Sequence, residues 1–234
     1  MEIFVNLMKK ISKITRRDYA KVELQNRGEN WILILDDVPL CSDEGCLIAS
    51  PNKPLMQDIM QEWQIQDGII NLNEMPLTRL LASALDLTQA QMQNMRTLLM
   101  EYVGNEMLAM RDEQNQDLYD TILQQVEGFL GVTYELHNQL IPPPQPAELL
   151  AKVHDWLATL SAQTLLTHYV LTQTLGSFAL SLAAIHLQLE PTIIMQAAWL
   201  EHDLQMQKWG EDASLLEKRH CDEKQLLACL KFMQ

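Results

Sequence analysis

A long uncharged segment constrains the fold of this chain more than any other feature. Between Trp156 and Leu189 there are 34 residues without an Asp, Glu, Lys or Arg. About 20 apolar residues are enough to cross a bilayer, but this segment also carries polar groups such as His168 and Thr172. Its flanks lack the basic residues that orient a membrane span. We therefore expect a buried helix over 163–188 at the centre of a folded core, and no stable membrane insertion.

The composition supports a folded protein and argues against a nucleic-acid partner. Hydrophobic residues make up 47% of the 234 positions, and a chain of this length buries about 70% of the surface that its unfolded form exposes. The 17 basic and 31 acidic side chains give a net charge of −14. Binding to phosphates needs clustered Lys and Arg, so we expect no nucleic acid among the partners.

The N-terminal part of the chain shows patterns typical of strands. Apolar and polar residues alternate over 19–24, and 31–35 is a continuous apolar run that suits a strand buried on both faces. Turn-forming residues cluster at 26–30 and 36–39, and 47–49 is a candidate third strand. The sequence therefore predicts a small β-rich unit here.

Helical patterns replace the strands after Ser50. Pro51 is placed to open a helix from its first turn, and Asp67-Gly68 to end it. Residues 132–136 are a candidate extended stretch, and the prolines of 141–146 a linker. Helix is expected almost throughout from about Leu77 onward, with Thr88 as the cap of a helix that runs through Leu99 and beyond. Further helices are expected at about 117–130, 147–160, 163–188, 191–208 and 213–232. We predict an α+β protein, with a β-rich domain over 1–78 that carries one or two helices and an all-helical domain over 79–234.

The sequence contains no convincing constellation for catalysis or metal binding. It has no H-E-x-x-H, G-x-S-x-G or phosphate-loop motif. The cysteines are Cys41, Cys46, Cys221 and Cys229, none of them in a C-x-x-C pair. Completion of a zinc site by His220-Cys221 is the weaker alternative to free thiols. We therefore predict no enzyme, no metal and no cofactor.

One carboxylate has an unusual position. Glu201 lies on the helical stripe that Ile194 and Ala197 define, and a carboxylate on an apolar stripe is costly unless it is paired or faces a groove. A boundary contact with Gln205 or Lys208 is one explanation. The other is that Glu201 is a polar anchor in a partner-binding surface.

Two further features suit a protein that binds other proteins. The chain has 13 methionines, whose flexible side chains adapt to imperfect partners, although core filling explains many of them equally well. Between Asp112 and Gln207 the only Lys or Arg is Lys152. Such a region has a negative field that would attract a basic partner.

Short motifs along most of the chain resemble those of one known family. In the N-terminal part they are Trp31, Leu35-Asp36, Pro39-Leu40, Pro51, Glu62-Trp63-x-x-Gln66 and Glu74-Met75-Pro76-Leu77-Thr78-Arg79-Leu80. In the C-terminal part they are Leu175-Gly176-Ser177, Leu200-Glu201, Gln205, Gln207 and Trp209-Gly210-Glu211-Asp212. Their order and spacing over 16–232 resemble the assembly chaperones of the F-type ATP synthase that bind the alpha subunit of its catalytic head, in mitochondria and alphaproteobacteria.

The resemblance implies a function without covalent chemistry. The chain would cover the inter-subunit face of the free alpha subunit until a beta subunit replaces it, and an exposed face of this kind would otherwise aggregate. A helical interaction or regulatory module with a different client is the alternative. We expect a monomer in the cytoplasm of a bacterium, because no convincing presequence precedes the strands, with the mitochondrial matrix as the alternative compartment.

The resemblance also assigns roles to individual residues. A functional acidic residue of the family matches Glu201, and Trp209 with Asp212 would hold that helix end in position. The candidate partner-binding residues are therefore Glu201, Gln205, Lys208, Trp209 and Asp212. The candidate structural residues are Trp31, Asp36, Pro51, Trp63, Pro76, Leu77, Thr78, Gly176 and Gly210.

The chain departs from the family pattern at several positions. Asp37 stands where the family has a Gly, and Cys41-Ser42 where it has Thr-Pro. Ala109-Met110-Arg111 replaces a Cys-Tyr-Arg, and Val126-Glu127-Gly128 a Trp-Asp-Pro. We expect a divergent member whose partner surface has changed together with its own client.

Overall fold

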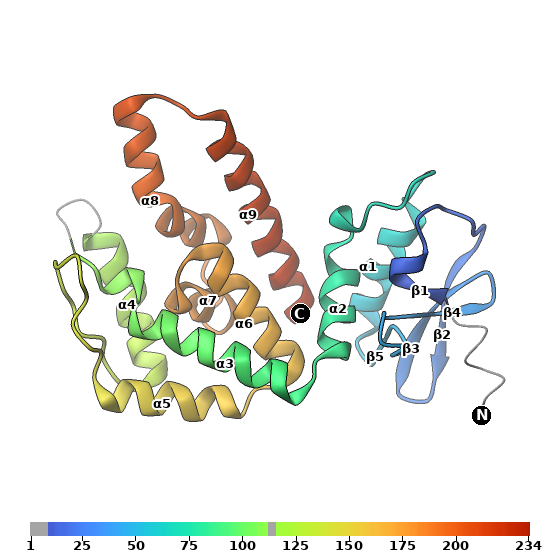
Figure 1. Ribbon diagram of the computed structural model, residues 1–234, viewed down its shortest axis with the longest axis horizontal. Coiled ribbons are helices and arrows are strands. Elements are labelled where there is room, and N and C mark those ends of the chain that lie inside the picture. The colour runs from blue at the N-terminus through green and yellow to red at the C-terminus, as the bar shows by residue number, and fades with distance from the viewer. Residues whose placement is uncertain (1–8, 112–115) are drawn as a thin grey trace. The chain divides into compact units, whose positions relative to one another are not determined.

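The chain folds into two compact units. The computed structural model describes residues 9–111 and 116–234 (Figure 1). One unit extends to Thr88 and the other begins at Gln89. A sheet with its helices forms the first unit and helices form the second, which confirms the predicted α+β class. The sequence placed the boundary at 78, ten residues earlier, and the reason for the difference is the helix over 76–86 described below.

The first unit is built on a five-stranded sheet of order β1-β4-β3-β2, with β5 also paired to β3. The strands are β1 (Lys9–Lys10), β2 (Val22–Arg27), β3 (Asn30–Leu35), β4 (Val38–Cys41) and β5 (Ala49–Ser50). The central strand β3 is antiparallel to β2, β4 and β5, whereas β1 runs parallel to β4. Leu33 and Leu35 are fully buried on β3, as the apolar run predicted.

The turn between β3 and β4 has only two residues, Asp36 and Asp37. Both have positive φ angles, 48° and 68°, as the tight hairpin turns that match the twist of a sheet require. The turn predicted over 36–39 was too long, since β4 begins at Val38. The Asp36 carboxylate accepts hydrogen bonds from the backbone N–H groups of Ala20 and Lys21, so Asp36 has a structural role there. Asp37 is exposed.

We expect Asp37→Gly to stabilise the first unit by about 0.5–1 kcal/mol, because glycine adopts a positive φ without the steric cost that an L side chain has. Asp36→Gly is the matched control and should destabilise the unit, since it removes the acceptor of two backbone N–H groups. Urea unfolding of both variants checks this. A destabilised Asp37→Gly protein would contradict the argument.

The first helix, α1, spans Lys53–Gln64. Asn52 is its N-cap and accepts a hydrogen bond from Leu55 N, and the proline in its first turn is Pro54. The prediction that Pro51 opens the helix was therefore wrong, because the Asn52 side chain caps the helix one residue after Pro51.

A buried carboxylate joins α1 to α2 (Pro76–Asp86). Glu62 is 9% exposed and accepts hydrogen bonds from Leu77 N at 2.8 Å, Thr78 N at 2.8 Å and Thr78 Oγ1 at 2.7 Å. The Trp63 indole N–H donates to the same Thr78 hydroxyl. These bonds satisfy N–H groups at the start of α2 that no helical carbonyl can reach, and the negative charge suits a helix N-terminus. The helix α2 thereby belongs to the first unit.

The second unit is helical. Its helices are α3 (Gln89–Gly104), α4 (Gln116–Leu130), α5 (Ala147–Ala158), α6 (Ala162–Leu175), α7 (Phe178–Ile185), α8 (Pro191–Trp209) and α9 (Ala213–Met233). Short 3-10 turns lie at Ile11–Lys13 and Leu72–Glu74 in the first unit, and at Met107–Ala109 in the second. The stretch 132–136, a candidate extended segment in the sequence, forms no strand in the described chain.

The uncharged segment forms two helices where the sequence predicted one. Gly176 has a φ of 72° and ends α6 in the left-handed conformation, and Ser177 caps α7 by accepting a hydrogen bond from Leu180 N. The prediction of a single helix over 163–188 was therefore wrong, although both helices are deeply buried. Among the described residues no helix is long and apolar enough to span a membrane.

A second buried carboxylate supports α7 from another element. Glu106 is 1% exposed and accepts hydrogen bonds from Ser177 Oγ, Ala179 N and Leu108 N. Burial raises the pKa of this carboxyl, and its hydrogen bonds oppose the shift. Its position at the N-terminus of α7 indicates a structural role.

Candidate functional site

The antiparallel pair of α8 and α9 extends away from the core of the second unit (Figure 1). The buried side chains of α8, the last of which is Trp199, all lie in its first half, and those of α9 begin at Asp222. No residue over 200–221 is buried. We call this part of the two helices the hairpin tip.

Charged and aromatic side chains hold the base of the hairpin tip together. Arg219 of α9 donates to Asp203 of α8 at 2.5 Å. The Lys218 ammonium and the Arg219 guanidinium lie 5.0 and 5.9 Å from the centroid of the Trp199 ring, which is within the range of cation–π attraction. Lys218 also pairs with Asp222 at 2.6 Å. The two helices therefore keep their pairing without a buried apolar seam over these residues.

Asp212 caps the start of α9. Its Oδ1 accepts hydrogen bonds from Ser214 N at 2.8 Å, Ser214 Oγ at 2.7 Å and Leu215 N at 3.4 Å. The hydrogen bonds from Ser214, followed by that from Leu215, lower the pKa of this carboxyl. Gly210 takes a positive φ of 96° immediately after α8, where it ends the helix. Gly210 and Asp212 together form the link between α8 and α9.

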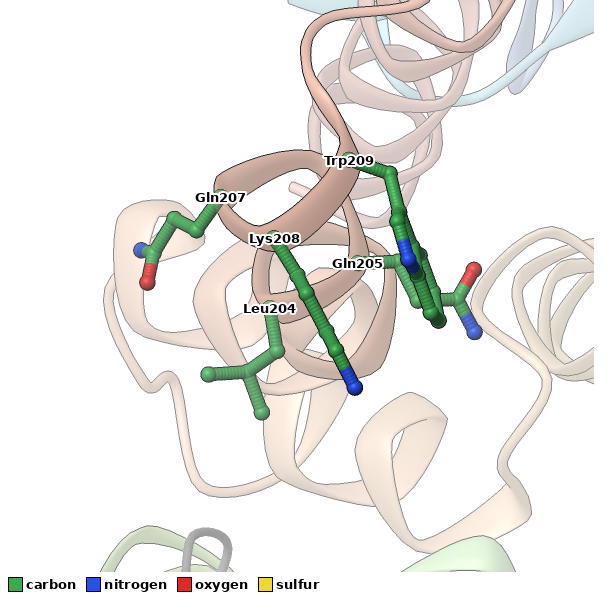
Figure 2. Close-up of a pocket in the computed structure, with 5 residues that line it drawn as sticks. All are labelled: Leu204, Gln205, Gln207, Lys208 and Trp209. Carbon is green, nitrogen blue, oxygen red and sulfur yellow. The ribbon is translucent and has the colours of Figure 1, made fainter.

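The last turn of α8 presents the most exposed aromatic ring of the described chain. Trp209 is 72% exposed, and the Lys208 ammonium lies 4.9 Å from its ring centroid. Figure 2 shows Lys208 and Trp209 projecting together, with Gln207 on another side of the helix. Two open hollows, of about 400 and 510 Å³, adjoin the ring, and Gln205 and Trp209 line both of them. Three of the predicted partner-binding residues therefore meet at one surface.

Glu201 lies on the same helix, two turns before Trp209. Its side chain is exposed, so the apolar stripe that its position suggested is not covered this far along α8. Of the hydrogen bonds and ion pairs among residues 9–111 and 116–234, none joins Glu201 to Gln205 or Lys208. The carboxylate is therefore available to an outside group.

A histidine pair in the core of the second unit is the second candidate site for chemistry. His168 Nε2 and His186 Nε2 are 3.0 Å apart, and the planes of the two rings are nearly parallel, at 9° to one another. Ser181 Oγ donates to Phe178 O and lies 3.0 Å from His168 Nδ1. The serine hydrogen is thus already used, so His168 must donate from Nδ1 and accept from His186 at Nε2.

This pair is structural. Burial lowers the pKa of His168 to about 3, with a smaller contribution from His186, and burial also lowers the pKa of His186. Trp156 packs edge-on against both rings, at 5.2 and 5.4 Å between centroids. His168 is therefore a buried, hydrogen-bonded part of the core.

The cysteines and the remaining acidic groups offer no metal site in the structure. All four cysteines are free thiols. Within the described ranges, no group of three or more His, Cys, Asp or Glu side chains could hold a metal ion.

Of the predicted structural residues, only Gly210 belongs to the hairpin tip. Trp31 is on β3, where Lys53 lies 4.3 Å from its ring centroid. Trp63 and Thr78 belong to the joint between α1 and α2, with Pro76 and Leu77 at the start of α2. The motif was recognised in the sequence but the role of Glu62 was not. An acidic residue in the last turn of one helix, before a Pro-Leu-Thr helix start, is the signal that would have indicated it.

Comparisons with known proteins agree with this architecture. A model of the family described as ATP12 chaperone protein matches residues 16–132, which is half of the chain. A point mutant of Atp12p from Paracoccus denitrificans superposes with a TM-score of 0.85 at 24% identity, over 94% of this chain and 97% of that one. The crystal structure of Atp12 from the same organism gives 0.84 at 24% identity, with the same coverage.

A third solved structure is similar in the same way. The Atu1473 protein of Agrobacterium tumefaciens matches with a TM-score of 0.85 at 24% identity, over 93% of this chain and 85% of that one. At this identity the three structures show the fold, and the family model shows the relationship. The chain therefore belongs to the ATP12 chaperone family.

Proposed function

We propose that this chain is an assembly chaperone that binds the free alpha subunit of the F-type ATP synthase and covers its inter-subunit surface until the beta subunit replaces it. The family supports the chaperone role. The observation that carries the proposal is the hairpin tip, where no side chain is buried by the chain itself and Trp209 is 72% exposed. An exposed aromatic ring beside open hollows is typical of a protein-binding surface.

The partner-binding residues have different tasks in this proposal. Trp209 supplies apolar area, with Lys208 beside its ring, and Gln205 lines both of the hollows that adjoin it. Glu201 supplies a charge that forms no hydrogen bond or ion pair with the side chains of residues 10–111 and 117–234. Asp212 acts through α9, whose N-terminus it caps, and thus fixes where the end of α8 lies.

The side chains at the hairpin tip also explain why the proposed function is binding without catalysis. The hollows at the hairpin tip are lined by apolar side chains such as Leu204 and Met206 together with amide, ammonium, indole and carboxylate groups, and no serine, cysteine or histidine is among the lining residues. Binding alone explains such a surface. We propose that the chain works as a monomer in the cytoplasm of a bacterium, with the mitochondrial matrix as the alternative compartment.

Charge reversal at Glu201 tests the proposal. With Glu201→Lys we expect about tenfold weaker binding of the alpha subunit, since the variant replaces an attractive contact by a repulsive one. Co-expression with the alpha subunit, followed by measurement of the soluble complex and of its dissociation constant, provides the readout. Glu101→Lys, at an exposed position of α3, is the matched control, because it changes the net charge by the same amount at a position outside the hairpin tip.

The outcomes separate three cases. Weak binding by Glu201→Lys with normal binding by Glu101→Lys supports the assigned contact. Normal binding by a folded Glu201→Lys protein removes Glu201 from the interface. If the wild-type chain does not bind the alpha subunit and instead retains another protein, the interaction module with a different client is correct.

A further inference from the structure

Figure 1 shows the loop between α4 and α5. This loop exposes apolar side chains that the fold leaves uncovered. Leu140 is 94% exposed and Ile141 80%, and these are the two most exposed of the large apolar side chains in the described parts of the chain. Leu136, on the same loop, is 47% exposed. Contiguous apolar exposure on one loop is costly in water and typical of an interaction site.

The loop is closed at its neck by a buried amide. Gln145 is 5% exposed, and its Oε1 accepts from Glu135 N at 2.9 Å while its Nε2 donates to Glu135 O at 3.2 Å. This pairing of one side chain with both backbone groups of Glu135 sets the two ends of the loop side by side. We call residues 135–145 the apolar loop.

Backbone pairing fixes the apolar loop to the rest of the unit. His137 N donates to Ala109 O at 3.0 Å, and Arg111 N donates to His137 O at 2.7 Å. Three consecutive prolines, 142–144, restrict the φ angles that follow Ile141. The chain thus holds its two most exposed apolar side chains in a defined place, which lowers the entropy lost when a partner binds them.

The surroundings of the apolar loop are acidic. Over 116–158 the charged residues are Asp117, Asp120, Glu127, Glu135, Glu148, Asp155 and a single basic one, Lys152. Glu135, at the start of the loop, and Glu148, in the first turn of α5, are exposed. A negative field of this kind repels an anionic membrane surface and favours a partner with basic side chains.

We propose that the apolar loop is a second docking point for the client, in which Leu140 and Ile141 enter an apolar cleft rimmed by Lys and Arg. This inference rests on the proposed function, because it takes the alpha subunit as the protein that carries the cleft. Leu140 and Ile141 are far from the hairpin tip in the sequence. Substitutions can therefore remove the proposed contact of the apolar loop and that of the hairpin tip separately.

The test measures the affinity of full-length variants for the alpha subunit at several salt concentrations. Leu140→Ser/Ile141→Ser should weaken binding about tenfold and leave the salt dependence unchanged, because the charges remain. Glu135→Lys/Glu148→Lys should weaken binding and reduce its salt dependence. Leu140→Met/Ile141→Val, which keeps the apolar surface, should bind normally.

Ile69→Ser is the matched control, since Ile69 is 72% exposed in the first unit. An equal loss with Ile69→Ser, or normal binding by Leu140→Ser/Ile141→Ser, would overturn the inference while the proposed function stands. Wild-type chain that fails to bind the alpha subunit overturns both. A wild-type dimer that the double variant converts to monomer, or flotation with anionic vesicles that requires Leu140, assigns the loop to a second copy or to lipid and likewise overturns it.

Discussion

Glu62→Ala should lower the free energy of unfolding of the first unit by about 3 kcal/mol. The carboxylate is 9% exposed and accepts three hydrogen bonds from the start of α2. Removal of a buried charged acceptor leaves its donors unsatisfied, and a loss of this kind costs several kcal/mol. Urea unfolding, together with hydrogen exchange of the α2 amides, measures the effect.

Two variants separate the contributions at this joint. Glu62→Gln keeps one carbonyl acceptor but places an N–H₂ group against a donor, so we expect a smaller loss than for Glu62→Ala. Thr78→Val keeps the volume and removes the hydroxyl that bonds to Glu62 and to the Trp63 indole. In both variants we expect faster hydrogen exchange of the backbone amides, confined to α1 and α2. Unchanged stability of Glu62→Ala would show that the carboxylate does not support the joint.

The stability of the second unit should fall as the pH is lowered, and His168 should account for about 2 kcal/mol of the loss at pH 5. The pKa of His168 is about 3 in the folded chain, whereas an ordinary histidine has 6.5. At pH 5 the unfolded chain therefore binds a proton at this position and the folded chain does not. A lowered folded-state pKa gives stability that is present above pH 6.5 and is lost as the pH falls from 6.5 toward 3.

His168→Asn tests this assignment. The asparagine N–H₂ group can still donate to Ser181, but position 168 no longer takes up a proton. The difference in unfolding free energy between pH 7.5 and pH 5 should therefore be about 2 kcal/mol smaller than in the wild type. The raised pKa of Glu106 acts in the opposite direction in both proteins and cancels in the comparison. His154→Asn, on the exposed side of α5, controls for the loss of a histidine, and an equal pH dependence of the wild type and His168→Asn would contradict the assignment.

Strong local patterns predicted much of the fold from the sequence. The apolar run at 31–35 became the buried strand β3, and Pro191 and Trp209-Gly210 mark the two ends of α8. These features depend on nearest neighbours and on the rigidity of proline and glycine, so one sequence is enough to find them.

Features that depend on distant contacts were not predicted. The short strand β4 was missed because its first residues, Val38 and Pro39, follow two aspartates and look like part of a turn, whereas pairing with β3 makes them a strand. The uncharged segment gave no periodic signal at Gly176, since apolar residues continue on both sides of it. Only the cap geometry reveals that a second helix begins there.

The candidate site was predicted by resemblance more than by pattern. Periodicity placed Glu201 on an apolar stripe, but the structure shows this part of α8 exposed. The argument from desolvation therefore does not apply to Glu201, which is instead notable because its exposed carboxylate is unpaired within the part of the chain that the structure describes. The exposure of Leu140 and Ile141 could not be derived from the sequence, because an apolar pair before three prolines is equally consistent with a buried loop.

The joint between α1 and α2 bears on how inherited changes in this chain should be interpreted. Residues such as Glu62, Trp63 and Thr78 stand out in the sequence, yet they bond to one another and not to an outside molecule. A substitution there would reduce the amount of folded chaperone in the cell and leave each surviving molecule competent. Alleles of this class would be sensitive to growth temperature and suppressed by overexpression. Under the proposed function, an allele at Trp209 would instead be insensitive to temperature, because it would weaken binding to the client without reducing the amount of folded chain.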